Sequence, residues 1–161
     1  LMARPLSLGP PRIPPRQAGL VIYPARQDDL LRLLPLQEAY EVEEVLTPIH
    51  RFEAGATRAG LVRSLRDQVV FWASLEGSPV AKAGTNARAF TLDQLGGIYV
   101  APPYRRRGIG EALVSTLVGK LEAEGREAVL FVKTLNEAAF ALYDGLGFQV
   151  LGEYRADYFG G

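Results

Sequence analysis

The hydrophobic positions of this 161-residue chain follow two different periods, and each period predicts its own kind of element. Short, mostly apolar runs predict strands at residues 20–24, 69–77, 78–90, 95–100 and 128–132. The last of these runs is apolar throughout, which is typical of a strand that is buried on both faces. Strands therefore make up much of the middle of the chain.

Apolar residues three or four positions apart predict four helices, at about residues 28–46, 54–67, 110–124 and 136–146. The third pattern is the clearest, because its leucines recur every four residues and a glycine follows the last turn. The predicted buried stripe of the first helix consists of Leu36, Ala39, Val42, Val45 and Leu46. This stripe leaves the acidic residues of that helix facing solvent or a cleft.

The order of elements is strand, two helices, three strands, helix, strand, helix, and one or two closing strands in FQVLGEYRADYF. This order predicts an α/β (α+β) domain with a mixed central β-sheet flanked by helices, over residues 20–161. Residues 1–19 hold five of the eleven prolines and show no apolar period. They predict a proline-rich arm or linker outside the core, which could lead to an additional N-terminal domain.

The amino-acid composition argues against several classes of function. Lysine plus arginine and aspartate plus glutamate are both 18, so no overall charge favours nucleic acid or an anionic membrane. The chain has no cysteine and one histidine, His50, which argues against a metal site and against a Ser-His-Asp triad. No apolar run approaches the roughly 20 residues of a membrane helix, and the N-terminus lacks an apolar signal core. We therefore expect a cytoplasmic protein.

The segment VAPPYRRRGIG, at residues 100–110, stands between a predicted strand and the clearest predicted helix. Its glycines place backbone N–H groups at a helix N-terminus, where the helix dipole also favours an anion. The segment lacks the Gly-Lys-Ser/Thr of an ATP-binding loop, and it does not follow the first strand as a dinucleotide-binding turn would. By itself the pattern fits either a phosphate site or a solvated turn, since arginine runs are usually surface charge.

The same eleven residues resemble the Val-x-Pro-x-x-Arg-x-x-Gly-x-Gly signature of the GNAT superfamily of N-acetyltransferases. A second segment, NEAAFALYDGLGF at residues 136–148, is similar to the Asn-x-x-Ala-x-x-x-Tyr-x-x-x-Gly-Phe helix of that family, in the same position of the element order. The resemblance implies the acyl-CoA N-acyltransferase (GNAT) fold and acetyl-CoA as co-substrate, with no metal.

The resemblance also implies roles for individual residues. The implied cofactor contacts are Ile98, Val100, Arg105, Arg106, Arg107, Gly108, Ile109, Gly110, Asn136 and Tyr143. Tyr143 would also act as the acid that protonates the leaving thiolate. Independently of the resemblance, Gly96 and Gly97 within a predicted strand indicate a bulge, where backbone N–H groups near Gly97 and Ile98 would stabilise the oxyanion. Asn136 also fits a plain helix N-cap, and Tyr143 also fits a packing residue of the core.

The general base is expected among Glu44 and Glu41, on the helix that borders the acceptor side, although a water chain would also suffice. A solvated helix face is the ordinary alternative for these glutamates, and a surface position is the ordinary one for His50. Three residues of the C-terminal segment are further candidates for recognising a cationic acceptor: Glu153, Asp157 and Tyr158.

The sequence thus predicts an acetyl-CoA-dependent N-acetyltransferase that passes the acetyl group directly to a primary amine, because there is no cysteine to hold it. The expected acceptor is a small-molecule amine or a protein or peptide amine, with neither nucleic acid nor membrane as partner. A homodimer is compatible with the sequence. The alternative is an acyl-CoA-binding sensor or regulatory domain without turnover, which the same binding motif would serve.

Overall fold

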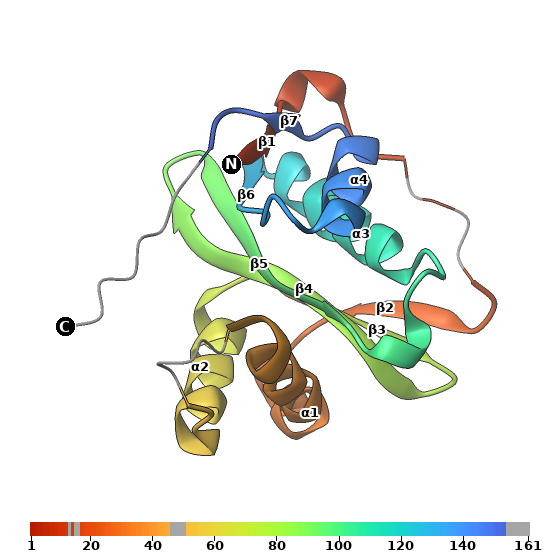
Figure 1. The fold of residues 1–161 in the computed structure, drawn as a ribbon, viewed down its shortest axis with the longest axis vertical. Coiled ribbons are helices and arrows are strands. Elements are labelled where there is room, and N and C mark those ends of the chain that lie inside the picture. The colour runs from red at the N-terminus through yellow and green to blue at the C-terminus, as the bar shows by residue number, and fades with distance from the viewer. Residues whose placement is uncertain (13, 15–16, 46–50, 154–161) are drawn as a thin grey trace.

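The computed structural model describes residues 1–12, 14, 17–45 and 51–153. Its strands are β1 (Met2–Arg4), β2 (Leu20–Pro24), β3 (Val70–Leu75), β4 (Ser78–Ala89), β5 (Leu92–Val100), β6 (Glu127–Leu130) and β7 (Gln149–Val150). They form one sheet in the order β2-β3-β4-β5-β6-β1-β7 (Figure 1). Only β5 and β6 are parallel among the described strand pairs, so the sheet is mixed, as the sequence predicts.

Helices cover both faces of this sheet (Figure 1). They are α1 (Leu30–Tyr40), α2 (Ala54–Asp67), α3 (Ile109–Ala123) and α4 (Glu137–Gly145). The first two lie on one face and the last two on the other, with a separate apolar cluster under each pair. The leucines of α3 are fully buried because their four-residue spacing turns one side of the helix toward the sheet. Within the described ranges, no helix is long and apolar enough to cross a membrane.

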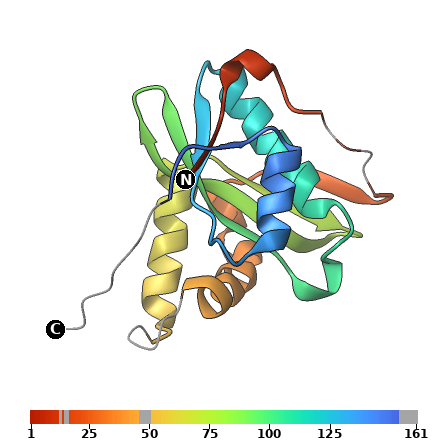
Figure 2. The same cartoon turned by 45° about the horizontal axis from the view of Figure 1, so that its top comes forward.

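The first residues of the chain form part of the sheet. β1 lies between β6 and β7 and is antiparallel to both, with Met2 opposite Leu130 on one side and Val150 on the other (Figure 1, Figure 2). Met2 is 1% exposed and belongs to the larger apolar cluster. The prediction that residues 1–19 contribute nothing to the core is therefore wrong for Met2–Arg4. The sequence pattern missed this strand because three residues are too few to show an apolar period.

A buried ion pair holds β1 against α3. The Arg4 guanidinium pairs with the Glu122 carboxylate, and both side chains are almost fully buried. Arg4 also donates a hydrogen bond from Nε to the Leu146 carbonyl, 2.7 Å away, just beyond α4. One arginine thus joins the N-terminal strand to two helices on the same face of the sheet.

The first predicted helix divides into two parts. α1 ends at Tyr40, and Glu41–Val45 form a π-helical turn with a wider hydrogen-bond repeat. The wider repeat takes Val42 off the apolar stripe, and its side chain is 57% exposed rather than buried as predicted. The residues of interest outside the described part are Leu46, His50, Asp157, Tyr158 and the side chain of Val45.

β5 and β6 pair over only a short stretch. Their register joins Leu92–Gln94 to Glu127–Val129, and beyond Gln94 no pairing between them is present in the described structure. The C-terminal half of β5 therefore separates from β6, and the start of α3 lies at this opening with Leu142 of α4 beside it. An added Cβ at Gly110, in the first turn of α3, would lie 3.4 Å from Val100 of β5, which shows how closely the helix start approaches the strand.

Candidate functional site

The turn after β5 ends in an uncapped helix start. A 3-10 turn at Pro102–Tyr104 leads into Arg106 and Gly108, which both have positive φ, at 61° and 74°. Gly108 is the N-cap of α3 and offers no side chain to the first amides of the helix. These amides cannot bond within the helix, so they and the helix dipole suit an anion. Ile109 as a whole residue is 1% exposed and belongs to the apolar cluster under α3 and α4, so its side chain is a core group.

The three arginines of the turn differ in their surroundings. Arg105 donates from Nε to the Val100 carbonyl at 2.8 Å and from its other end to the Glu43 carboxylate, also at 2.8 Å. This contact lowers the pKa of Glu43 and fastens the π-helical turn to the end of β5. Arg106 and Arg107 are exposed beside the start of α3, where they add positive charge. Arg105 is thus already engaged by protein groups.

The strand β5 carries a bulge at the position that its two glycines predict. Gly97 has a φ of +60°, and the register with β4 shifts beside Gly96. An added Cβ at Gly96 would overlap the exposed Asn86 side chain, which would have to move aside. The next residue, Ile98, packs toward the cluster under α3 and α4. The bulge therefore brings irregular backbone to the edge where β5 leaves β6.

The start and middle of α4 hold the second motif. The Asn136 side-chain oxygen accepts a hydrogen bond from the Ala139 amide at 3.1 Å, so the N-cap role is present and the side-chain NH2 group still has donors for a ligand. Tyr143 is 8% exposed and packs edge-on against Phe148. Burial raises the pKa of Tyr143 to about 12, and Glu44 adds to this effect. Its hydroxyl therefore keeps its proton at neutral pH.

The two glutamates predicted as bases lie in different surroundings. Glu41 accepts a hydrogen bond from Gln37 at 3.0 Å and lines a pocket under the sheet. Glu44 lies 3.7 Å from the Lys133 ammonium and close enough to Tyr143 to influence its pKa. Glu153 is exposed. Glu44 thus acts electrostatically on the predicted acid, whereas Glu41 lines a separate cavity. No three potential metal-ligating side chains gather within the described ranges.

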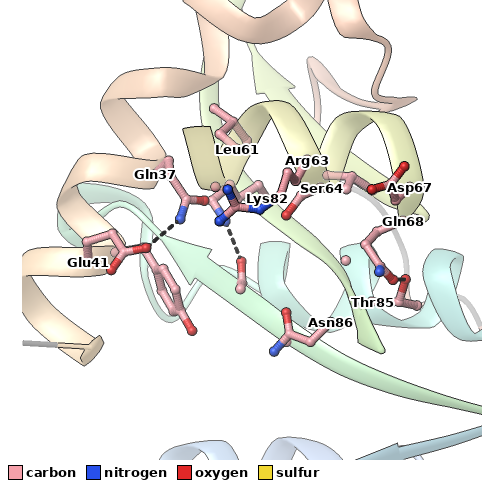
Figure 3. A pocket seen from close by; sticks show the side chains of 16 residues that line it. Gln37, Glu41, Leu61, Arg63, Ser64, Asp67, Gln68, Lys82, Thr85 and Asn86 are labelled. Atoms are coloured by element: carbon pink, nitrogen blue, oxygen red, sulfur yellow. Dashed lines mark hydrogen bonds between the residues drawn. The ribbon is translucent and has the colours of Figure 1, made fainter. Parts of the chain in front are cut away.

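This cavity, of about 450 Å³, lies between α1, α2, β4 and β5 (Figure 3). Its lining is mostly polar and includes Lys82 of β4, a residue that the sequence analysis did not single out. Lys82 is 4% exposed, donates to the Gly97 carbonyl at 2.9 Å, and lies 4.8 Å from the ring centre of Tyr40. Burial lowers the pKa of Lys82 to about 8. The sequence signal that could have pointed to Lys82 is a single charged residue in the otherwise uncharged middle of a predicted strand.

The lowered pKa of Lys82 predicts a pH-dependent stability. Between pH 8 and about 9.5 the native lysine is largely neutral, whereas the unfolded one, with a pKa near 10.4, still holds its proton. The unfolded state then binds more protons, so the free energy of unfolding should rise by about 1–2 kcal/mol across this window. Urea denaturation at several pH values measures the rise. Lys82→Met should abolish it, whereas Lys120→Met should keep it, and an equal rise in both variants would contradict the assignment.

The comparisons with known proteins fit this geometry. Residues 34–148, well over half of the chain, match the model of the Acetyltransferase (GNAT) family. The chain belongs to the GNAT acetyltransferase family. Rat N-acetyltransferase family 8 member 3 is 44% identical over 62 residues, which are 38% of this chain and 27% of that protein. The [ribosomal protein bS18]-alanine N-acetyltransferase of Escherichia coli K12 is 46% identical over 53 residues, 32% of this chain and 36% of that protein. The matched segments thus span little more than a third of these relatives at most.

Solved structures confirm the GNAT fold. An acetyltransferase of the GNAT family from Streptococcus pneumoniae superposes with a TM-score of 0.70 at 22% identity, over 88% of this chain and 91% of that one. A predicted acetyltransferase with acetyl-CoA from Clostridium acetobutylicum gives a TM-score of 0.67 at 16% identity, over 86% and 96% of the two chains. The mixed sheet flanked by helices is therefore the acyl-CoA N-acyltransferase fold, as the motifs predict.

Proposed function

We propose that this protein transfers an acetyl group from acetyl-CoA directly to a primary amine. The observation that carries the proposal is the opening between β5 and β6. The uncapped start of α3 lies against Val100 there, and the buried Tyr143 belongs to the apolar cluster against which Ile98 and Val100 pack. Membership of the GNAT family and a structural relative named with acetyl-CoA support it. When bound, acetyl-CoA would supply an acetyl group activated as a thioester.

The residues at the opening fit the parts of such a molecule. The amides at Gly108, Ile109 and Gly110 would hold the pyrophosphate, since they lie at the uncapped start of α3 and carry the positive end of its dipole. The backbone groups of Ile98 and Val100 would bind the extended pantetheine arm along the free edge of β5. Arg105 would act by positioning the turn, because its guanidinium is held by protein groups.

Tyr143 would donate a hydrogen bond to the departing sulfur. With a pKa of about 12 its hydroxyl is protonated at any pH near neutrality, so a donor is always present. A thiolate with a pKa near 8.5 is a weaker base than a tyrosinate, so complete proton transfer from Tyr143 is uphill. Stabilising the negative charge as it develops on sulfur is therefore the main expected contribution.

The acceptor amine would enter from the α1 and α2 side, through the cavity lined by Tyr40, Glu41 and Lys82. Glu41 and Glu44 are the carboxylates proposed to receive its proton, directly or through water. The name of the Escherichia coli relative specifies an alanine of a ribosomal protein. We propose a peptide or small-molecule primary amine as the acceptor class.

Calorimetric titration with acetyl-CoA, followed by thiol detection of released CoA with a panel of primary amines, tests this function. Binding followed by release with at least one amine class is the expected result. Absence of binding would overturn the proposal. Tight binding without release across small amines, amino acids and peptides would instead favour the sensor.

Gly108→Ala should weaken acetyl-CoA binding about tenfold. Gly108 has a left-handed backbone that costs a residue with a Cβ about 1–2 kcal/mol, so the unbound turn would relax and the strain would be restored on binding. Calorimetry measures the change. Gly119→Ala in the same helix is the matched control, because an added Cβ there meets no atom within 4 Å. Equal affinities in the two variants would place the cofactor elsewhere.

A further inference from the structure

One amine of the chain already lies where an acceptor amine would bind. The sequence contains three lysines, Lys82, Lys120 and Lys133. The side chains of Lys120 and Lys133 are 52% and 71% exposed, whereas Lys82 is 4% exposed and ends inside the cavity (Figure 3). Lys82 therefore differs from the other lysines in position as well as in burial.

The groups around the Lys82 amine are those that bind a primary amine. The Gly97 carbonyl accepts a hydrogen bond from Nζ at 2.9 Å, and the Tyr40 ring presents its face at 4.8 Å. Glu41 lines the same cavity and exerts an electrostatic effect on Lys82, whereas Arg63 lines it from α2. The Lys82 amine is thus held by the same kinds of group that would hold the amine of a substrate.

The position of Nζ relative to β5 adds a second observation. An added Cβ at Gly97 would lie 3.0 Å from Nζ, so the amine lies directly against the backbone of the bulge. Gly96 and Gly97 carry no side chains, and Ile98 follows at once on the free strand edge. No side chain of these two residues therefore stands between the lysine and the edge that would bind the thioester.

The Lys82 amine is also chemically suited to react. No carboxylate lies within ion-pair distance of it in the described structure, so no salt bridge holds its proton. With a pKa of about 8, about a tenth of it is neutral at pH 7. An exposed lysine with a pKa near 10.4 is neutral in less than about one molecule in a thousand. Only the neutral amine has the lone pair that attacks a carbonyl.

We propose that Lys82 is a site of self-acetylation, with acetyl-CoA bound at β5 as the donor. The neutral Nζ attacks the thioester carbon, a C–N bond forms, the C–S bond breaks, and its electron pair leaves with sulfur. The proton lost from nitrogen neutralises the thiolate, which gives N-acetyl-lysine and CoA. The proposal rests on the proposed acetyl-CoA site. The product fills part of the acceptor cavity with a neutral amide and removes its buried cation.

The test needs no knowledge of the acceptor. Protein and acetyl-CoA are incubated alone, and intact mass spectrometry with peptide mapping follows the three lysines over time. Lys82 should be acetylated at least about tenfold faster than Lys120 or Lys133, because it combines a larger neutral fraction with a bound donor. Excess free CoA should slow Lys82 alone, since only that reaction would need the binding site. Lys82→Arg should remove the fast site, and Lys120→Arg should leave it unchanged.

The outcomes separate this proposal from the one on which it rests. If calorimetry shows that acetyl-CoA binds and Lys82 remains unmodified, self-acetylation is overturned and the transferase proposal stands. If all three lysines react at similar rates that free CoA does not change, the modification is ordinary chemical acetylation and the proposal is again overturned. Absence of acetyl-CoA binding overturns both.

Discussion

Tyr143→Phe is expected to lower the turnover number for acetyl transfer about 100-fold and to leave acetyl-CoA affinity within about twofold. The change removes one hydroxyl from a ring that is 8% exposed and packs edge-on against Phe148, so the packing is retained. What is lost is a hydrogen bond to charge that develops only during the reaction. Binding in the ground state should therefore change little, whereas the barrier should rise by about 2.7 kcal/mol.

Steady-state release of CoA with a responsive amine measures turnover, and calorimetry measures affinity. Tyr23→Phe is a matched control, because that ring lies against Trp72 and belongs to β2, an edge strand that β3, β4 and β5 separate from β6. It should leave both quantities unchanged. If Tyr143→Phe turns over like the unaltered protein, Tyr143 is a packing residue and the sulfur is stabilised by another group.

Arg4→Met should lower the free energy of unfolding by about 3–4 kcal/mol. Methionine fills a similar length of the site but leaves the Glu122 carboxylate buried without its charge partner. That carboxylate already has one oxygen, Oε2, without a hydrogen-bond partner in the described structure, and burial raises the pKa of Glu122 despite Arg4. The Leu146 carbonyl also loses its donor. The unpaired buried charge is the largest of these costs.

Urea denaturation at pH 7 measures the change, and a double variant isolates its cause. Arg4→Met with Glu122→Leu removes both charges, so it should recover most of the lost stability. Arg32→Met is the surface control. Its partner Asp29 lies 2.7 Å away, but the arginine side chain is 53% exposed, so about 0.5 kcal/mol or less is expected. A double variant as unstable as the single one would show that β1 needs the arginine itself rather than charge balance.

The elements with a long, regular pattern were predictable from the sequence. α2 and α3 agree with their predicted ranges to within a residue at each end, because leucines at helical spacing dominate both helices. The bulge at Gly97 followed from two glycines within a strand, since a left-handed φ there favours a residue without Cβ. The GNAT family assignment followed from two motifs in the right order, and the family match confirms it.

Other features depend on contacts that no local pattern contains. β1 is a strand because it pairs with β6 and β7 on its two sides. Its own three residues are too few to predict a strand. The π-helical turn takes Val42 off the predicted apolar stripe, and the α-helical period of the sequence does not predict such a turn. Lys82 looks like an ordinary strand lysine until β4 is covered by α1 and α2, which together exclude water from it. Contacts with distant elements decide the place of β1 and the burial of Lys82.

The place of β1 in the sheet also constrains the order in which the protein can fold. Arg4 contacts Glu122, 118 residues away, and Leu146, 142 residues away, so every partner of β1 belongs to the other end of the described chain. Such long loops are slow to close, whereas the hairpin from β3 to β4 closes locally. β7 has β1 as its strand neighbour and cannot join before it. The half of the sheet that contains β6, β1 and β7 would therefore be completed last during synthesis, and β1 would limit when this half is assembled.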